Sequence, residues 1–203
     1  MSTSSHHPVV LGVTGASGAI YSRRLLHVLL DTNCDGHLSV SPSGKAVFEQ
    51  ELSESLDLDN FSVDQFLGTA TPLSGRLTYH HYKNLMAPIA SGSFLTNAMV
   101  ICPCSWSTLS AVTHAMGDNL IHRAAEVHLK ERRKLVVVPR ESPLSLPQLK
   151  NMQAIHEAGA VVLPASPGFY HNPESIDDLV DFVVSRICDQ LNITNELVGR
   201  WGH

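Results

Sequence analysis

Side chains that could do chemistry recur in this sequence directly after short apolar runs. Most are small residues, and the others carry an indole, a guanidinium, a carboxyl group or a phenol. They are Gly15, Ala16, Ser17, Ser41, Ser105, Trp106, Ser107, Thr108, Arg140, Glu141 and Tyr170. Hydroxyls and backbone N–H groups at a strand-to-helix turn bind phosphate. A carboxyl group beside them can give or take a proton. The pattern predicts a site for a phosphate-bearing ligand.

The first turn is rich in glycine, with Gly12, Gly15 and Gly18 at three-residue spacing. Glycine lets the backbone approach a ligand closely. The spacing matches neither the dinucleotide fingerprint, since no acidic residue fits about 20 positions on, nor the P-loop, since the Lys-Ser/Thr pair is missing. The alternative to a ligand site at this glycine-rich turn is a tight turn that binds nothing. For the hydroxyls of Ser105–Thr108, the alternative to phosphate binding is ordinary capping of a helix.

Three cations are candidates for binding a second phosphate. Arg140 follows a buried strand, where a charge is less expected, and Arg186 flanks the apolar stripe of the last helix. Lys130 opens the charged run 130–134, which is also typical of a solvated helix end. Glu141 could act as a general acid or base, or simply pair with Arg140.

A metal site is not predicted, although the chain has 12 histidines and 4 cysteines. There is no H-E-x-x-H, and the pairs His6-His7 and His80-His81 are adjacent residues that converge poorly on one ion. Cys102 and Cys104 form C-x-C without a second pair, so buried thiols are the expected state. No G-x-S-x-G elbow supports a hydrolase.

The elements that must position these residues alternate between strand and helix. Strands are predicted at 9–13, 36–40, 98–102, 135–138 and 161–163, and helices at 19–30, 44–52, 105–116, 119–132, 145–158 and 176–191. Residues 57–93 are predicted to be irregular, with a short helix near 63–67 and a short strand near Leu77. Pro103 and Pro139 are expected to end their strands. Apolar strands alternating with helices predict an α/β fold with one doubly wound, Rossmann-like parallel sheet covered on both faces.

Length and charge narrow the function further. The chain has 203 residues, which suits a single domain over 1–203 with a flexible N-terminus at 1–7. A net charge of −5 without blocks of like charge argues against binding nucleic acid or a membrane surface. No apolar run approaches a membrane span, and no targeting segment is apparent, so a cytoplasmic location is expected.

Seven motifs resemble those of the UbiX-type flavin prenyltransferases, over about residues 9–201. They are Gly15-Ala16-Ser17-Gly18-Ala19-x-Tyr21, Ala90-Ser91-Gly92-Ser93, Met99-Val100-Ile101-Cys102-Pro103-Cys104-Ser105, Asn119-Leu120-Ile121-x-Arg123-Ala124, Leu129-Lys130-Glu131-Arg132-Arg133, Val138-Pro139-Arg140-Glu141 and Pro167-Gly168-Phe169-Tyr170. The last four, in this order, are highly specific.

The resemblance implies a flavoprotein-type fold and a metal-independent prenyltransferase. Such an enzyme joins a dimethylallyl group from dimethylallyl phosphate to N5 and C6 of reduced FMN. The product, prenylated FMN, serves a partner decarboxylase, for instance in ubiquinone biosynthesis. The resemblance also implies a homo-oligomer, typically a dodecamer, with sites at subunit junctions.

The resemblance assigns roles residue by residue. The positions matching FMN contacts are Gly15, Ala16, Ser17, Ser41, Ser105, Trp106, Ser107, Thr108, Arg123 and Arg140. Lys130, Tyr170 and Arg186 match prenyl-phosphate positions. Lys130 and Glu141 match catalytic positions lent by a neighbouring subunit, and Ser17 and Glu51 match groups that transfer protons around the flavin.

Two departures and two alternatives accompany this resemblance. Trp106 occupies a turn where relatives often carry smaller residues, and Leu85 stands where some carry a tryptophan beside the prenyl group. One alternative is an FMN-dependent cysteine-peptide decarboxylase, but the Pro-Ala-Ser-Ala-Asn-Thr run of that class is replaced by 103–108. The other is an FMN carrier for the decarboxylase, which would not need Lys130, Glu141 and Arg186 together.

Overall fold

The computed structural model describes residues 7–69, 74–200 and 202. The predicted flexible segment falls mainly on residues 1–6, which lie outside the described residues. Within the described ranges, no helix combines the length and the apolar character needed to cross a bilayer.

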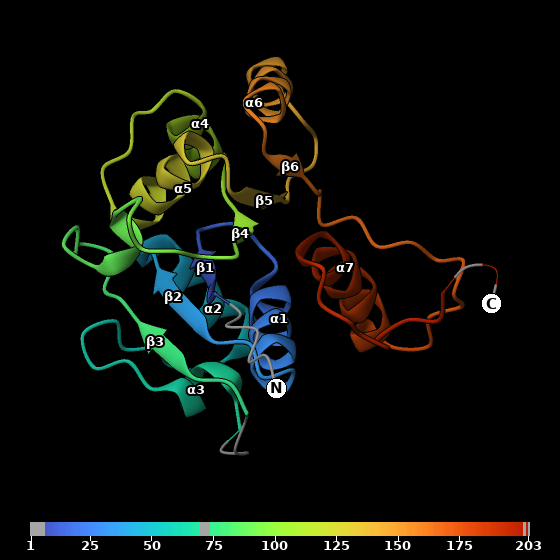
Figure 1. Cartoon of the computed structure of the whole chain (residues 1–203). Helices are drawn as coiled ribbons and strands as arrows, with labels where there is room; N and C mark the ends of the chain where they lie inside the picture. The colour runs from blue at the N-terminus through green and yellow to red at the C-terminus, as the bar shows by residue number, and fades with distance from the viewer. Residues whose placement is uncertain (1–6, 70–73, 201, 203) are drawn as a thin grey trace, which may run out of the picture.

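Six parallel strands form one sheet in the order β3-β2-β1-β4-β5-β6 (Figure 1). Their bounds are β1 Val9–Val13, β2 Gly36–Val40, β3 Leu77–Tyr79, β4 Ala98–Cys104, β5 Lys134–Pro139 and β6 Val161–Val162. The chain winds outward in one direction from β1 to β3 and in the other from β4 to β6, which confirms the doubly wound prediction. The direction of winding reverses between β1 and β4, where such sheets bind their ligands.

Helices cover both faces of the sheet. They are α1 Ala19–Asp31, α2 Pro42–Leu52, α3 Val63–Leu67, α4 Trp106–Thr113, α5 Leu120–Lys130, α6 Leu146–Glu157 and α7 Ile176–Leu191, with a 3-10 turn η1 at Pro88–Ala90. One core joins α1, α2, α3 and α7 to the sheet, and a second core joins η1, α4, α5 and α6 to the opposite face. Side-chain alternation divides β1 accordingly, since Val9, Leu11 and Val13 enter the first core and Val10 the second.

The strand ends differ from prediction at two prolines. β4 continues through Pro103 to Cys104, and β5 includes Pro139, so the expectation that these prolines end their strands is wrong. Cys104 pairs with Pro139 after a shift of register beyond Ile101, so the ladder resumes past the position where Pro103 lacks an N–H. The shift also moves Cys104 into the second core, although Cys102 lies in the first. The shift therefore changes the position from which the turn at Ser105 leaves the end of β4, compared with a strand of regular alternation.

Candidate active site

Backbone contacts bring the exits of β2, β1 and β4 into one continuous rim. The Ser41 N–H donates to the Val13 carbonyl at 2.9 Å, which joins the exits of β2 and β1. Thr14 is buried and joins β1 to β4 twice: its hydroxyl donates to the Pro103 carbonyl at 2.9 Å and accepts from the Ser105 N–H at 2.8 Å. These hydrogen bonds hold three predicted phosphate-binding turns side by side.

Two glycines allow this close approach. A Cβ added to Gly15 would lie 2.4 Å from the Ser43 Cβ, and one added to Gly44 would lie 2.6 Å from the Val13 carbonyl oxygen. Each position therefore excludes any side chain unless the two loops move apart. Ser41 caps α2 by accepting from the Gly44 N–H at 3.0 Å, which explains why that helix begins at Pro42 and not at Gly44 as predicted.

The rim continues across β5 and β6. Cys104 is the register partner of Pro139, and the Ala165 N–H donates to the Pro139 carbonyl at 3.0 Å. A hollow of about 440 Å³ lies at these strand ends, lined among others by Trp106, Arg140 and Glu141. The structure thus brings a cation, an acid and an indole together at the carboxyl edge, as the sequence predicts.

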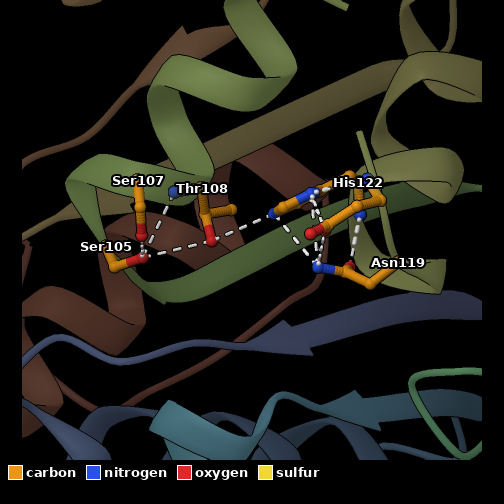
Figure 2. Close-up of polar contacts among 6 residues, drawn as sticks. Ser105, Ser107, Thr108, Asn119 and His122 are labelled. Atoms are coloured by element: carbon orange, nitrogen blue, oxygen red, sulfur yellow. Dashed lines mark hydrogen bonds and ion pairs between the residues drawn. The ribbon is translucent and has the colours of Figure 1, made fainter. Parts of the chain in front are cut away.

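The turn after β4 forms a polar cradle (Figure 2). The Ser105 hydroxyl accepts from the Thr108 N–H at 3.3 Å, and it lies 3.1 Å from the hydroxyls of both Ser107 and Thr108. The Ser105 hydroxyl alone caps the helix. Ser107 is exposed at the first turn of α4, so its hydroxyl can still contact a ligand. The free N–H groups of that turn add donors for an anion or a carbonyl oxygen.

Glu51 reaches from α2 to the start of α1. Its carboxylate accepts from the Gly18 N–H at 2.9 Å and from the Ala19 N–H at 2.8 Å. A carboxylate at the positive end of a helix dipole stabilises that end of the helix. Tyr21, one turn into α1, lies in the field of both Arg140 and Glu51, and burial raises the pKa of its phenol. Glu51, Tyr21 and Arg140 therefore surround the same end of β1.

Two of the three predicted phosphate-binding cations, Lys130 and Arg186, lie away from the rim in the single chain. Lys130 ends α5 and contacts Glu131 beside Gly92, at the amino edge of the sheet. β5 has six residues, so Lys130 and Arg140 are separated by about 20 Å. Arg186 pairs with Asp189 at 2.8 Å in the C-terminal half of α7.

Arg123 and Tyr170 complete the predicted set. Arg123 donates from Nε to the Ala90 carbonyl at 3.2 Å and is exposed. The Tyr170 ring packs edge-on against Phe182 of α7, with ring centroids 5.6 Å apart. Tyr170 is also half exposed, so it is open to a ligand or a neighbouring chain.

Sequence reasoning missed four residues of this region. Thr14, Tyr21 and Ser43 support the rim, and His122 touches the cradle from α5 through Thr108 at 3.3 Å. Thr14 could have been found, since a threonine directly after a strand stands where strand-end ligands bind. The contact from His122 spans 14 residues and has no sequence signal.

Replacing Thr14 with valine should destabilise the rim. Valine has nearly the same side-chain shape as threonine, but it leaves the Ser105 N–H and the Pro103 carbonyl with one hydrogen-bond partner fewer each. The free energy of unfolding should fall by about 1–3 kcal/mol. Urea denaturation measures this loss, with Thr32→Val as the control because its hydroxyl donates within its own helix, to the Val28 and Leu29 carbonyls at 2.9 and 3.0 Å. An equal loss in both variants would contradict the bridging role of Thr14.

The residues of the rim fit FMN. The Ser105 turn and the Gly15 turn offer hydroxyls and N–H groups to polar oxygens, while Arg140 supplies positive charge. Among the described residues, the indole N–H of Trp106, a side chain that lines the hollow, is buried and has no hydrogen-bond partner, as expected of a donor that a bound group would satisfy. The described residues contain no group of three or more side chains that could hold a metal ion.

Comparison with known proteins decides the family. A family model described as Flavoprotein matches residues 1–188. Flavin prenyltransferase UbiX of Pseudomonas aeruginosa is 47% identical over 198 residues, which cover 96% of this chain and 93% of the relative. UbiX of Thermoplasma acidophilum is 45% identical, with 95% and 99% covered. This chain belongs to the UbiX family of flavin prenyltransferases.

Solved structures agree with this membership. AnUbiX (PadA1), in complex with FMN and dimethylallyl pyrophosphate, superposes with a TM-score of 0.85 at 34% identity, covering 98% of each chain. A dodecameric FMN-dependent UbiX-like decarboxylase from Escherichia coli O157:H7 gives 0.84 at 36% identity, covering 97% of this chain and 100% of that one. The cysteine decarboxylase TvaF, at 14% identity and a TM-score of 0.57, shares the fold alone. The resemblance drawn from the motifs is confirmed, and with it FMN as the cofactor.

Proposed function

We propose that this UbiX family member transfers a dimethylallyl group from dimethylallyl phosphate to N5 and C6 of reduced FMN. The observation that carries the proposal is the rim itself, where Thr14 ties the flavin-binding turns together next to Arg140 and Glu141. Membership of the family and the FMN and dimethylallyl pyrophosphate held by AnUbiX support it. The prenylated FMN would serve a partner decarboxylase.

The residues proposed to hold FMN belong to the rim. Gly15, Ala16 and Ser17 follow β1, Ser41 follows β2, and Ser105–Thr108 follow β4. Arg140 would balance a negative charge, and Trp106 would offer its free N–H. Arg123 would have to leave the Ala90 carbonyl to take part. Reduced FMN would supply the two nucleophilic atoms of the reaction.

The second phosphate requires a neighbouring copy of the chain. Lys130 and Arg140 lie at opposite edges of the sheet, so one chain cannot place both on one phosphate. We infer that Lys130 acts in the site of a neighbouring subunit, while Tyr170, in the loop before α7, and Arg186, on α7, bind the prenyl phosphate. The dodecameric UbiX-like neighbour supports a homo-oligomer with sites at subunit junctions.

The proposed residues act mainly through charge. Cleavage of the allylic C–O bond leaves negative charge on phosphate, which Lys130, Arg140 and Arg186 would stabilise. Glu141, which the resemblance assigns to a neighbouring subunit's site, lines the same hollow as Arg140 of its own chain. Its exposed carboxyl group can supply or collect a proton there. Glu51 and Ser17 flank the start of α1, where they can handle a proton near the flavin.

Anaerobic incubation with reduced FMN and dimethylallyl phosphate tests this function. Mass analysis should show a flavin heavier by one five-carbon prenyl unit, because transfer adds that unit to FMN. Unchanged flavin that stays bound would contradict the proposal and indicate a carrier. Release of carbon dioxide from a cysteinyl peptide would instead indicate a decarboxylase.

A further inference from the structure

A chain of hydrogen bonds leads from the rim to a buried histidine (Figure 2). The Ser107 and Ser105 hydroxyls are 3.1 Å apart, and the Ser105 hydroxyl donates to the Thr108 Oγ1 at 3.1 Å. Thr108 Oγ1 lies 3.3 Å from Nε2 of His122, and His122 Nδ1 lies 3.2 Å from the Asp118 carboxylate. Three hydroxyls therefore connect the exposed cradle to an imidazole and a carboxylate.

The direction of the chain follows from its proton count. Each hydroxyl carries one proton, and Ser105 uses its own on Thr108, so the Thr108 proton is free for Nε2 of His122. Nδ1 faces the Asp118 carboxylate at 3.2 Å and the Asp118 backbone N–H at 3.4 Å. The charged carboxylate is the stronger partner, so the ring proton stays on Nδ1 and Nε2 accepts. Ser107 in turn donates to Ser105, so the lone pairs of the Ser107 oxygen face outward. With this direction of donation, the Ser107 oxygen can accept a proton from a ligand.

Burial keeps the imidazole ready for this role. His122 is 8% exposed, and burial lowers the pKa of its ring, with Asp118 and Glu126 opposing that effect more weakly. Asp118 and Glu126 are the acidic side chains that face the ring, and α4 offers it the hydroxyl of Thr108. Asn119 caps α5 by accepting the His122 N–H at 3.1 Å, and its amide donates to the Asp118 carboxylate at 3.0 Å. The carboxylate is thus held at the far end of the chain.

We propose that His122, oriented by Asp118, is the inner proton acceptor of a relay that begins at Ser107. The inference rests on the proposed function, since joining carbon to N5 and C6 of reduced flavin displaces one proton from each atom, while the prenyl double bond takes up one proton and the allylic C–O bond breaks to release phosphate. Ser107 takes a ligand proton as its own passes to Ser105, the Ser105 proton passes to Thr108, and the Thr108 proton reaches Nε2. His122 then releases the Nδ1 proton through Asp118, whose side chain is 85% exposed. No oxidant or reductant is required.

Nitrogen-15 NMR of the histidine rings tests the relay without catalysis. We expect His122 at neutral pH to be the neutral tautomer with the proton on Nδ1, and Thr108→Val to abolish that preference. An Nε2–H tautomer in the wild-type protein would overturn the proposal, because Thr108 could then not pass a proton inward.

Activity provides the second test. His122→Gln should slow formation of the heavier flavin at least a hundredfold and remove the loss of rate as pH falls through the His122 pKa. Thr108→Val should have the same effect, and the double variant should be no slower, because one relay is broken in each case. FMN affinity of His122→Gln, measured by flavin fluorescence, should stay within about tenfold of wild type, the size of one hydrogen bond.

His128→Gln is the matched control. His128 is a second buried histidine of α5, but its Nδ1 and Nε2 contact the Ala124 carbonyl at 2.7 Å and Thr96 at 2.8 Å, away from the cradle. Equal rates and pH profiles in the two glutamine variants would overturn the relay. If the wild-type protein forms no heavier flavin, the proposed function fails instead, and the tautomer measurement still decides the direction of the chain.

Discussion

Replacing Lys130 with alanine should lower prenyl transfer by about 10²- to 10³-fold while FMN binding remains. A loss of rate of this size is typical when an enzyme loses one charged group that stabilises negative charge developing in the transition state. FMN binding persists because Lys130 ends α5 at the amino edge, whereas the flavin-binding turns lie at the carboxyl edge. Formation of the heavier flavin and FMN fluorescence measure the two properties separately. Arg186→Ala should behave in the same way.

Mixing variants tests whether subunits share the site. Lys130→Ala and Arg140→Ala subunits, unfolded and refolded together, should regain part of the activity, because some junctions then combine an intact Lys130 with an intact Arg140. Arg76→Ala is the control, since Arg76 is 87% exposed and pairs with Asp35 at 3.0 Å, next to the first residue of β2. Mixtures without regained activity would show that both cations act within one chain, contrary to the separation across β5. Loss of FMN from Lys130→Ala would refute its assignment to the prenyl phosphate.

Glu51→Gln should slow prenyl transfer by about 10²-fold or more, the usual size of a lost general acid or base. The amide keeps an oxygen that can accept from the Gly18 and Ala19 N–H groups, so the cap of α1 largely survives. Glu51→Ala removes the cap as well and should lower the free energy of unfolding by about 1 kcal/mol. Rates from flavin mass analysis and unfolding curves in urea separate the two roles.

Glu49→Gln is the matched control for Glu51. Glu49 lies on the same helix and accepts from the Leu56 N–H at 3.0 Å, so it has a structural role away from the start of α1. If Glu51→Gln keeps the full rate while Glu51→Ala loses stability, Glu51 only caps α1, and its predicted catalytic role is wrong.

Local pattern was enough to predict most elements of the fold. The spacing of apolar residues predicted β1, β2 and α3 with the bounds observed, and it predicted α7 from Ile176 to Leu191. These elements are continuous in sequence, so an apolar run reports a strand buried on both faces, and helical spacing reports the buried face of α7. The ends of β4 and β5 were predicted less well, because pairing between Cys104 and Pro139 outweighs the local tendency of proline to end a strand.

In the candidate site, too, the residue types could be predicted from local sequence, whereas contacts between distant segments could not. Residue types at the strand ends, from Gly15 to Tyr170, could be named without coordinates, because parallel strands bring their carboxyl ends to one edge. The bridging of the two turns by Thr14 and the cap that Glu51 places on α1 were not predicted, because both depend on the distance between segments that are far apart in sequence.

By itself, the sequence determined the alternation of strand and helix, the identity of the residues after each strand, and the motifs that mark the UbiX family. The tertiary structure decided which of those residues meet: Arg140 joins the rim, while Lys130 lies at the opposite edge of the sheet. It also decided that His122 touches Thr108. The physical reason is that periodicity records which face of an element is buried, whereas contacts between elements depend on register, twist and packing, which the whole chain sets together.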